Sequence, residues 1–341
     1  MLYVGIDVHQ NRSNACILGD DGQKVKTLEV RGHVEKLIQA LRDFARRHDQ
    51  PMAAAFEASL GYGPIHERLS KFCHRVVVAH PGKLRLISQC KRKHDRIDAE
   101  KLAVLLRVDL LPQVHVPKVQ VRHWRKMIEF RRRAVDARTR TKNSLRSLLR
   151  SELIVKPKGV GGLWTKKGLA WLAQVELDPA LAMQRDMLLD DLTHQQQRIT
   201  RLTAELDRMG QRHPAVALLK TIPGVGPRTA EAFVAYIDRP ERFGRSRQAG
   251  TYVGLVPCED SSGGKQRLGH ITKEGPGTLR KLLVEASWRG VKTCPRLAAT
   301  FDRLVAGDPG RRKIAIVAMA RRLAELMCAM MRSGEVYRQA A

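Results

Sequence analysis

The sequence predicts an α/β amino-terminal domain, a long helical middle and a mainly helical carboxy-terminal domain. Strand-like and helix-like patterns alternate through the first 118 residues. The stretch from 121 to 151 contains neither glycine nor proline, as expected of one long helix. The last third holds helical patterns separated by glycine-rich turns. We therefore place the three parts at residues 1–118, 119–212 and 213–341.

The composition indicates a globular protein that binds a polyanion. Hydrophobic residues make up 43% of the 341 residues, which excludes wholesale disorder. Lys and Arg number 62 against 34 Asp and Glu, a net charge of +28. Such an excess repels itself unless it is neutralised, and nucleic acid is the default partner. Aromatic residues are only 5% of the chain, which argues against a protein built mainly on base-stacking platforms.

Other features favour a cytoplasmic protein with reduced cysteines and no membrane partner. No apolar run approaches the ~20 residues that span a bilayer. The amino terminus, MLYVGIDVHQ, lacks the basic start and cleavage site of a signal peptide. The six cysteines form no CxxC pair, and the 12 histidines form no HxxxH or HExxH pair.

The amino-terminal elements follow the order β-β-β-α-β-α-β-α. Turn residues and β-branched content predict strands, and apolar spacing predicts helices. The strands are expected at 2–8, 13–18, 24–30, 52–56 and 76–79, and the helices at 33–47, 62–73, 81–88 and 95–107. This is the order of an RNase H-like fold, a mixed sheet with helices on its faces.

Four carboxylates in this region predict a metal site. Asp7 interrupts an apolar strand, and Glu57 ends another. Asp95 and Asp98 are three residues apart and therefore share one helix face. In an RNase H-like arrangement the two strand ends lie side by side and the helix packs across them, so that all four converge. Mg²⁺ prefers such oxygen ligands, and two ions about 3.5–4 Å apart would polarise a phosphodiester. Taken singly, each acid also fits an ordinary strand end or a capped helix.

The middle of the chain carries a basic helix and a heptad pattern. Between Arg122 and Arg150 there are 11 Lys or Arg and two acids, which favours contact with phosphates by residues such as Arg131, Arg132 and Arg138. A seam of apolar residues with one polar position, Gln195, follows. It indicates a coiled coil, either between two chains or as an antiparallel pair with the first long helix. The seam comprises Leu188, Leu192, Gln195, Ile199, Leu202, Leu206 and Met209.

Two glycine-rich segments stand out in the last third. Residues 218–237, LLKTIPGVGPRTAEAFVAYI, have a helix-hairpin-helix-like pattern whose glycines would let backbone N–H groups approach a DNA phosphate. The other, 254–277, contains SSGG together with Lys265, Arg267 and Lys273, which could bind phosphate oxygens. From the residues alone SSGG reads as a flexible turn, and no His-Asp relay accompanies it.

GIDVH, AFEASLGYG and KHDRIDAEKLA resemble the DEDD domain of the transposases of the "insertion sequence 110" family, a domain similar to the RuvC resolvase domain. TIPGVGPRTAEAF, RFGRSRQAGTYVGLVP and SSGGKQRLGHITKEGPGTLRKLLVEA resemble the same family's carboxy-terminal serine transposase domain. The resemblance covers nearly the whole chain, with the motifs in the same order.

The resemblance implies an enzyme that mobilises an insertion sequence by DNA recombination. It implies that Asp7, Glu57, Asp95 and Asp98 bind the metal and that Ser262 is the nucleophile, forming a covalent phosphoserine linkage to DNA. It further implies donor and target DNA as substrates, a structured non-coding guide RNA, and a homo-oligomer, dimer or tetramer. Two alternatives remain: a RuvC-type metal-dependent nuclease without a covalent intermediate, and a non-enzymatic nucleic-acid-binding assembly protein.

Overall fold

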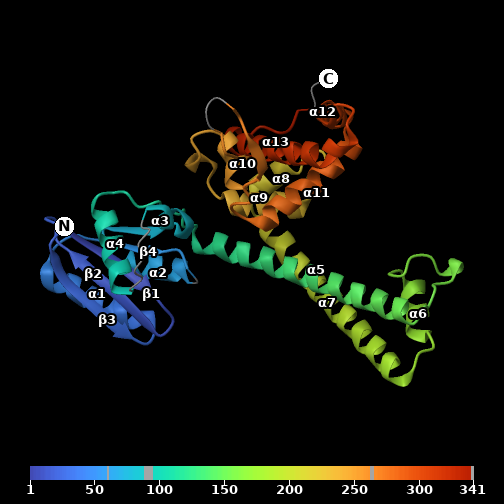
Figure 1. Ribbon diagram of the computed structural model, residues 1–341, viewed down its shortest axis with the longest axis horizontal. Coiled ribbons are helices and arrows are strands. Elements are labelled where there is room, and N and C mark those ends of the chain that lie inside the picture. The colour runs from blue at the N-terminus through green and yellow to red at the C-terminus, as the bar shows by residue number, and fades with distance from the viewer. Residues whose placement is uncertain (60, 88–94, 262–264, 339–341) are drawn as a thin grey trace. The chain divides into compact units, whose positions relative to one another are not determined.

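The chain forms two compact units, Met1–Val119 and Gln120–Ala341 (Figure 1). The computed structural model describes residues 1–59, 61–87, 95–261 and 265–338, and at 85–87, 95 and 96 it describes the backbone alone. Within these ranges no helix combines the length and the apolarity needed to cross a lipid bilayer.

A five-stranded mixed sheet forms the centre of the first unit, with the strand order β3-β2-β1-β4-β5. The first three strands pair antiparallel, and β1, β4 and β5 pair in parallel. The mixed sheet predicted from the sequence is confirmed, and the strands begin and end close to the expected residues. Their bounds are β1 (Leu2–Val8), β2 (Arg12–Leu18), β3 (Lys24–Arg31), β4 (Met52–Glu57) and β5 (Arg75–Ala79).

Helices cover both faces of this sheet (Figure 1). On one face, α1 (Val34–His48) and α2 (Tyr62–Leu69) pack onto a cluster that contains Val4, Ile6 and Phe56. On the other, α4 (Asp95–Arg107) packs onto Ala53 and Ala55, and α3 (Pro81–Ile87) contributes Leu84 to the same cluster.

The helix α2 was predicted to reach Cys73, and the structure ends it at Leu69. The backbone turns at Ser70 because the following residues must enter the sheet. The His74 N–H donates to the Met52 carbonyl at 2.8 Å, and this bond aligns β5 with β4.

Two 33-residue helices, α5 (Val119–Ser151) and α7 (Pro179–Gln211), pack antiparallel in the second unit. Trp124 and Ile128 near the start of α5 share a cluster with Leu206 near the end of α7. Leu145 and Leu149 near the end of α5 meet Leu192. The predicted seam of α7 is therefore buried within one chain. The short helices η1 (Lys158–Val160) and α6 (Lys166–Gln174) connect the pair.

The remaining helices surround α9 (Pro227–Ile237), whose residues from Thr229 to Ile237 are all buried. A short hairpin, β6 (Pro257–Glu259) and β7 (Leu268–Ile271), interrupts them. The other elements are α8 (Pro214–Leu219), η2 (Pro240–Arg242), α10 (Arg247–Tyr252), α11 (Gly277–Thr293), α12 (Pro295–Val305), η3 (Pro309–Arg311) and α13 (Arg312–Ser333).

Candidate functional site

Strand register brings Asp7 and Glu57 to the same edge of the sheet. In the parallel pair formed by β1 and β4, Ile6 lies opposite Phe56. Asp7 and Glu57 are the next residue on each strand, at the carboxyl end of both. The Asp7 side chain is 20% exposed, and Glu57 lies at the surface.

Both carboxylates lie on the face of the sheet that α4 covers. Side chains alternate along a strand, so Asp7 shares its face with Gly5, and Glu57 shares its face with Ala55. Ala55 packs in the cluster that includes Leu102 and Leu106 of α4. At Gly5 the contact is closer still. An added Cβ would lie less than 3.0 Å from the Ala99 carbonyl oxygen, nearer than real Cβ atoms approach.

The amino terminus of α4 points toward this edge. Ala99 lies against Gly5 in the middle of β1, whereas Arg107 at the other end of the helix donates to the carbonyl of Asp20. Asp20 accepts a bond from the Tyr3 hydroxyl at the beginning of β1. The helix therefore runs opposite to β1, and its first turn, with Asp95 and Asp98, extends toward Asp7 and Glu57. The Asp95 side chain is not among those described.

Asp7 and Asp98 each contact a side chain two or three residues further along the chain. His9 Nε2 lies 3.1 Å from Asp7 Oδ2, and Lys101 Nζ lies 3.5 Å from Asp98 Oδ1. His9 was not singled out from the sequence, although it follows Asp7 by only two residues.

The donor chemistry of this edge fits a divalent cation. It offers carboxylate oxygens, which Mg²⁺ prefers over nitrogen and sulfur. Among the side chains that the structure describes, no three His, Cys, Asp or Glu lie close enough together to hold an ion, and this search does not include Asp95. The four-residue metal set stays a prediction.

The predicted nucleophile, Ser262, lies outside the described residues. Its neighbour Ser261 lies in the segment that joins β6 to β7, and its hydroxyl takes part in two hydrogen bonds. The Ser261 hydroxyl donates to Glu259 Oε1 at 2.8 Å and accepts from the Arg267 N–H at 3.2 Å.

The base of the hairpin is tightly packed, in contrast to its exposed arms. A Cβ on Gly254, whose φ is +70°, would lie under 3.0 Å from the backbone of Lys273 and Glu274. Arg280 Nη1 donates to the carbonyls of Val253 and Glu274, at 2.7 and 2.9 Å. These contacts fix the backbone segments that lead into β6 and out of β7.

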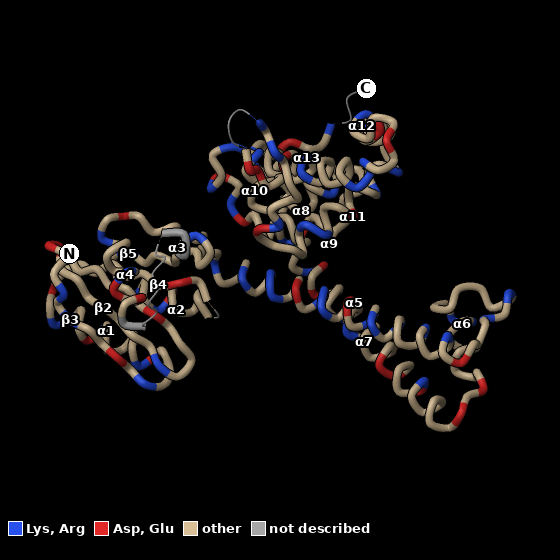
Figure 2. Tube along the Cα trace, in the orientation of Figure 1, with Lys and Arg blue, Asp and Glu red and all other residues tan. Residues whose placement is uncertain are grey.

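The predicted phosphate-binding residues fall into two groups. Lys265, Arg267 and Lys273 on the hairpin segment are exposed. The three arginines of α5 are half-buried and bonded within the chain. Arg131 donates to Thr203, Arg132 pairs with Glu129 and Asp136, and Arg138 donates to Gln196. Figure 2 shows Lys and Arg recurring along the rest of α5. Phosphate contact by either group stays a prediction.

The helix-hairpin-helix-like turn between α8 and α9 packs into the protein. Gly224 has φ +86°, and an added Cβ would lie under 3.0 Å from the backbone of Ala286 and Gly290 on α11. The close approach that this glycine permits is thus to a helix of the same unit. DNA contact by this turn stays a prediction.

An ionic cluster around a buried carboxyl lies where α9 meets α5 and α7, and no pattern in the sequence indicated it. Glu231 on α9 has a side chain that is 2% exposed, and its Oε1 lies 2.8 Å from Arg228 Nη2. Arg228 also pairs with Asp207 of α7. Glu231 Oε2 is buried and has no hydrogen-bond partner among the described residues. Burial raises the pKa of Glu231 to about 7, against the lowering effect of Arg228.

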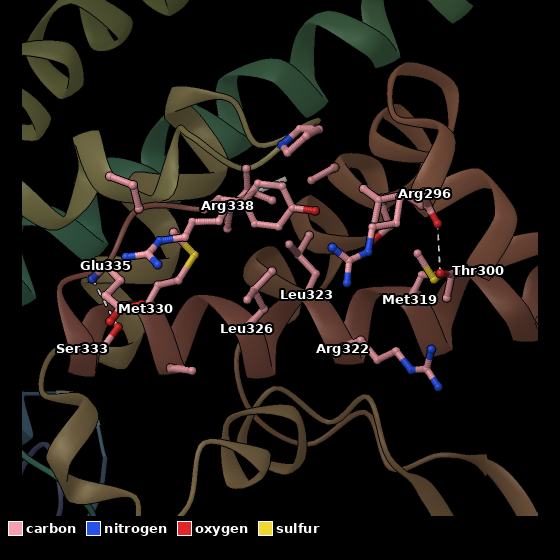
Figure 3. Close-up of a pocket in the computed structure, with 18 residues that line it drawn as sticks. Arg296, Thr300, Met319, Arg322, Leu323, Leu326, Met330, Ser333, Glu335 and Arg338 are labelled. Carbon is pink, nitrogen blue, oxygen red and sulfur yellow. Dashed lines mark hydrogen bonds between the residues drawn. The ribbon is translucent and has the colours of Figure 1, made fainter. Parts of the chain in front are cut away.

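A cavity of about 540 Å³ lies beside α13 (Figure 3). Met319, Leu323 and Leu326 line it, and the segment after α13 covers part of it. The Tyr337 N–H in that segment donates to Thr221 Oγ1 at 3.1 Å. Arg296 and Arg338 approach the cavity from different sides (Figure 3). Apolar side chains of α13 form much of its wall, and Glu335, Ser287 and Ser333 are among the other residues that line it.

Family models match two stretches of the chain, and the first stretch continues past the end of the first unit at Val119. Residues 4–153 match the DEDD transposase family of the IS110 type, and residues 216–302 match the family described as "Transposase IS116/IS110/IS902 family". These matches define the chain as a transposase, an enzyme of DNA cleavage and rejoining.

Curated transposases are similar over most of their length. A "Probable family 20 transposase" of Pseudomonas aeruginosa is 29% identical over 72% of this chain and 74% of its own. The "Transposase for insertion sequence element IS1111A" of Coxiella burnetii is 28% identical over 72% and 68%, and that for IS1328 of Yersinia enterocolitica is 26% identical over 84% and 86%. The chain belongs to the IS116/IS110/IS902 family of transposases.

Proposed function

We propose that this transposase moves an insertion sequence through a covalent protein–DNA intermediate. Asp7, Glu57, Asp95 and Asp98 hold Mg²⁺ in an RNase H-like, RuvC-like unit, and Ser262 is the nucleophile. The observation that carries the proposal is that two strand-end carboxylates and the first turn of α4 occupy one edge and one face of the sheet.

The metal, when bound, neutralises charge on the scissile phosphate and polarises it toward attack. Asp7 and Glu57 supply oxygens from two adjacent strands, and Asp98 supplies one from the helix. His9, 3.1 Å from Asp7, holds that carboxylate in place. The positive end of the α4 dipole further favours negative charge at this edge.

The engagement of Ser261 supports Ser262 as the attacking residue. The hydroxyl of Ser261 is committed to Glu259 and to the Arg267 N–H. In the proposed step the Ser262 oxygen bonds to phosphorus, its proton passes to solvent, and one DNA strand leaves as a free hydroxyl. Attack by a strand hydroxyl on the phosphoserine then restores the serine, and the number of phosphodiester bonds is conserved.

The cationic residues position the nucleic acids in this proposal. Lys265, Arg267 and Lys273 bind phosphate oxygens near Ser262, and Arg131, Arg132 and Arg138 on the coiled coil of α5 and α7 contribute positive charge. The proposed partners are donor and target DNA, a structured guide RNA and further copies of the chain, as a dimer or tetramer associated with the nucleoid.

The experiment compares Ser262→Ala with Ser261→Ala on DNA that carries the element ends. We expect Ser262→Ala to abolish a protein–DNA adduct that survives denaturing gels, and Ser261→Ala to retain it. Strand cleavage that persists in Ser262→Ala without any adduct would instead identify a metal-dependent nuclease with water as the nucleophile. An adduct that is lost only in Ser261→Ala would contradict the proposal and identify Ser261 as the nucleophile.

A further inference from the structure

A second cavity lies between α5, α7 and the segment that contains Trp164 and the start of α6, and its residues are distant in the sequence from the acids and the hairpin serines. Its volume is about 540 Å³. One part of its wall is apolar, formed by Trp164, Leu169, Leu189 and Leu192, and another carries the amides of Gln196 and Gln197. All of these residues belong to the second unit.

Three cations lie along one face of α5 beside this cavity. Arg138, Lys142 and Arg146 are spaced four residues apart, so their side chains follow one another on the helix. Lys142 Nζ lies 4.9 Å and Arg146 Cζ 5.2 Å from the centre of the Trp164 ring. The ring therefore holds both cations at the cavity through cation–π contact.

No carboxylate among the described residues neutralises these cations. Arg138 is bonded to the neutral Gln196 amide, and neither Lys142 nor Arg146 forms an ion pair in the described ranges. Burial lowers the pKa of Lys142, and repulsion from Arg138 and Arg146 lowers it further. An anion bound here would relieve that repulsion.

The cations, the leucine side chains and the two amides together indicate which kind of ligand would fit the cavity. A phosphate suits the cations, and a flat ring with polar edges suits a cavity of leucine side chains and two amides. Gln196 accepts from Arg138 through Oε1, which leaves its NH₂ group to donate to a ring edge. The Trp164 Nε1 is buried without a hydrogen-bond partner among the described residues, so the protein alone does not satisfy the polar groups around the cavity.

We propose that this cavity binds one unpaired nucleotide of a nucleic-acid strand, with its phosphate on Lys142 and Arg146 and its base against Leu189, Leu192 and the amides of Gln196 and Gln197. A base within a duplex is stacked and paired, so only a separated strand presents one. The site is independent of the proposed chemistry, because none of its residues belongs to the acidic set or to the hairpin.

The test uses the full-length protein and a 15-nucleotide oligo(dT) with one central 2-aminopurine, whose fluorescence reports burial of that base. Thr193→Phe fills the cavity without changing charge. Thr193 is exposed on α7 and bonds only to its own helix, through the Leu189 carbonyl at 3.0 Å, so α7 keeps its fold. Lys142→Gln removes one cation, and Lys126→Gln at an exposed position of the same helix is its matched control. Binding is measured at about 0.3 M salt, where non-specific phosphate contacts weaken.

We expect Thr193→Phe and Lys142→Gln each to raise the dissociation constant about tenfold and to abolish the fluorescence change, while Lys126→Gln stays within about twofold. A matching oligo(U) distinguishes the source, since tighter binding of either strand identifies RNA or DNA as the natural occupant. Circular dichroism verifies that the variants fold.

Three results would overturn the proposal. The first is wild-type affinity and fluorescence in Thr193→Phe. The second is an abasic strand that binds as tightly as oligo(dT), which would mean that phosphate alone is bound. The third is a duplex that gives the same base signal as the single strand. Because no strand is cut in this assay, its failure leaves the transposase chemistry untouched, and loss of chemistry leaves this assay unaffected.

Discussion

The two units place their candidate catalytic residues in contrasting ways. In the first, Asp7 and Glu57 come from adjacent strands whose register sets where both side chains lie. In the second, Ser261, the described neighbour of the proposed nucleophile, lies at the end of a two-stranded hairpin with exposed arms and a packed base. A metal requires several oxygens at fixed positions, whereas a serine that forms a bond to DNA must reach its phosphate. Rigid and exposed parts of the fold therefore suit different steps of the proposed reaction.

If the acidic edge holds a metal, recombination should be sensitive to the charge of its carboxylates. Asp7→Asn keeps the size of the side chain and removes the charge that a divalent ion requires. We expect recombination to fall at least about a thousandfold, equivalent to ~4 kcal/mol of barrier, because one ligand of the metal is weakened. The assay is excision of a marked element in cells, and the amount of folded protein is measured in parallel.

Asp43→Asn is the matched control for this change. Asp43 lies on α1 and accepts a bond from Gln39 at 3.0 Å. Its variant should retain wild-type recombination. Equal activity of the Asp7 and Asp43 variants would show that the acidic edge does not bind a catalytic metal, and would favour a nucleic-acid-binding role for the chain.

In both units a glycine packs directly against the backbone of a helix. Gly5→Ala would force β1 away from α4, and Gly224→Ala would force the α8–α9 turn away from α11. We expect each to lower the free energy of unfolding by about 3 kcal/mol, since neither contacting backbone can move aside easily. Gly224→Ala is additionally strained by the positive φ.

Denaturant unfolding measures these effects, and two glycines serve as controls. A Cβ on Gly82 meets only ordinary contacts with His80, and one on Gly159 meets no described atom within 4 Å. Alanine there should change stability by under about 0.5 kcal/mol. If Gly5→Ala were equally mild, α4 would not lie against β1 as described, and its first turn would lose its place at the acidic edge.

How far the sequence predicts these sites depends on how local their determinants are. Strand alternation and β-branched runs act within a few residues, so the strands and the mixed sheet were predicted closely. The apolar run that contains Asp7 and the acid that ends the next strand were visible for the same reason. The edge they share follows from parallel pairing, which the order of elements predicts.

Features that depend on contacts between distant segments were not predictable in this way. Arg131 reads as a solvated cation on a basic helix, yet it is half-buried against α7. Gly224 reads as a site of phosphate approach, yet α11 fills that space. Glu231 reads as an ordinary helix residue in TAEAF, and only the packing of α9 against two other helices buries it. The partners of Arg131 and Gly224 lie more than 60 residues away in the sequence, and Asp207 of α7 lies 24 residues before Glu231.

The buried carboxyl of Glu231 makes the stability of the second unit dependent on pH. Its pKa is raised from 4.5 to about 7 in the folded protein, so between these values the folded chain holds one more proton than the unfolded chain. Stability from this group therefore falls as pH rises from about 4.5 to 7 and then levels off, by on the order of 3 kcal/mol. The charged groups that bear on Glu231 are Arg228 of α9, Asp207 of α7, Arg131 of α5 and Lys220.

We expect Glu231→Gln to remove this slope while keeping the shape of the side chain. The measurement is denaturant unfolding of the wild type and the variant at pH 5 and pH 8, where the difference between the two pH values should shrink in the variant. Glu285→Gln changes an exposed position on α11 that lines a small cavity together with Glu231, and it should leave the wild-type slope. A variant with an unchanged slope would mean that Glu231 stays ionised in the folded protein throughout this range.

The smallest effect is expected from an ion pair of nearly the same length in the first unit. Lys24 Nζ lies 2.7 Å from Glu100 Oε2, close to the 2.8 Å between Arg228 and Glu231. The side chains of Lys24 and Glu100 are 47% and 43% exposed, so water screens them. We expect Glu100→Gln to cost about 0.5 kcal/mol, and less at about 1 M salt. A loss as large as 3 kcal/mol, insensitive to salt, would mean that water does not screen this pair.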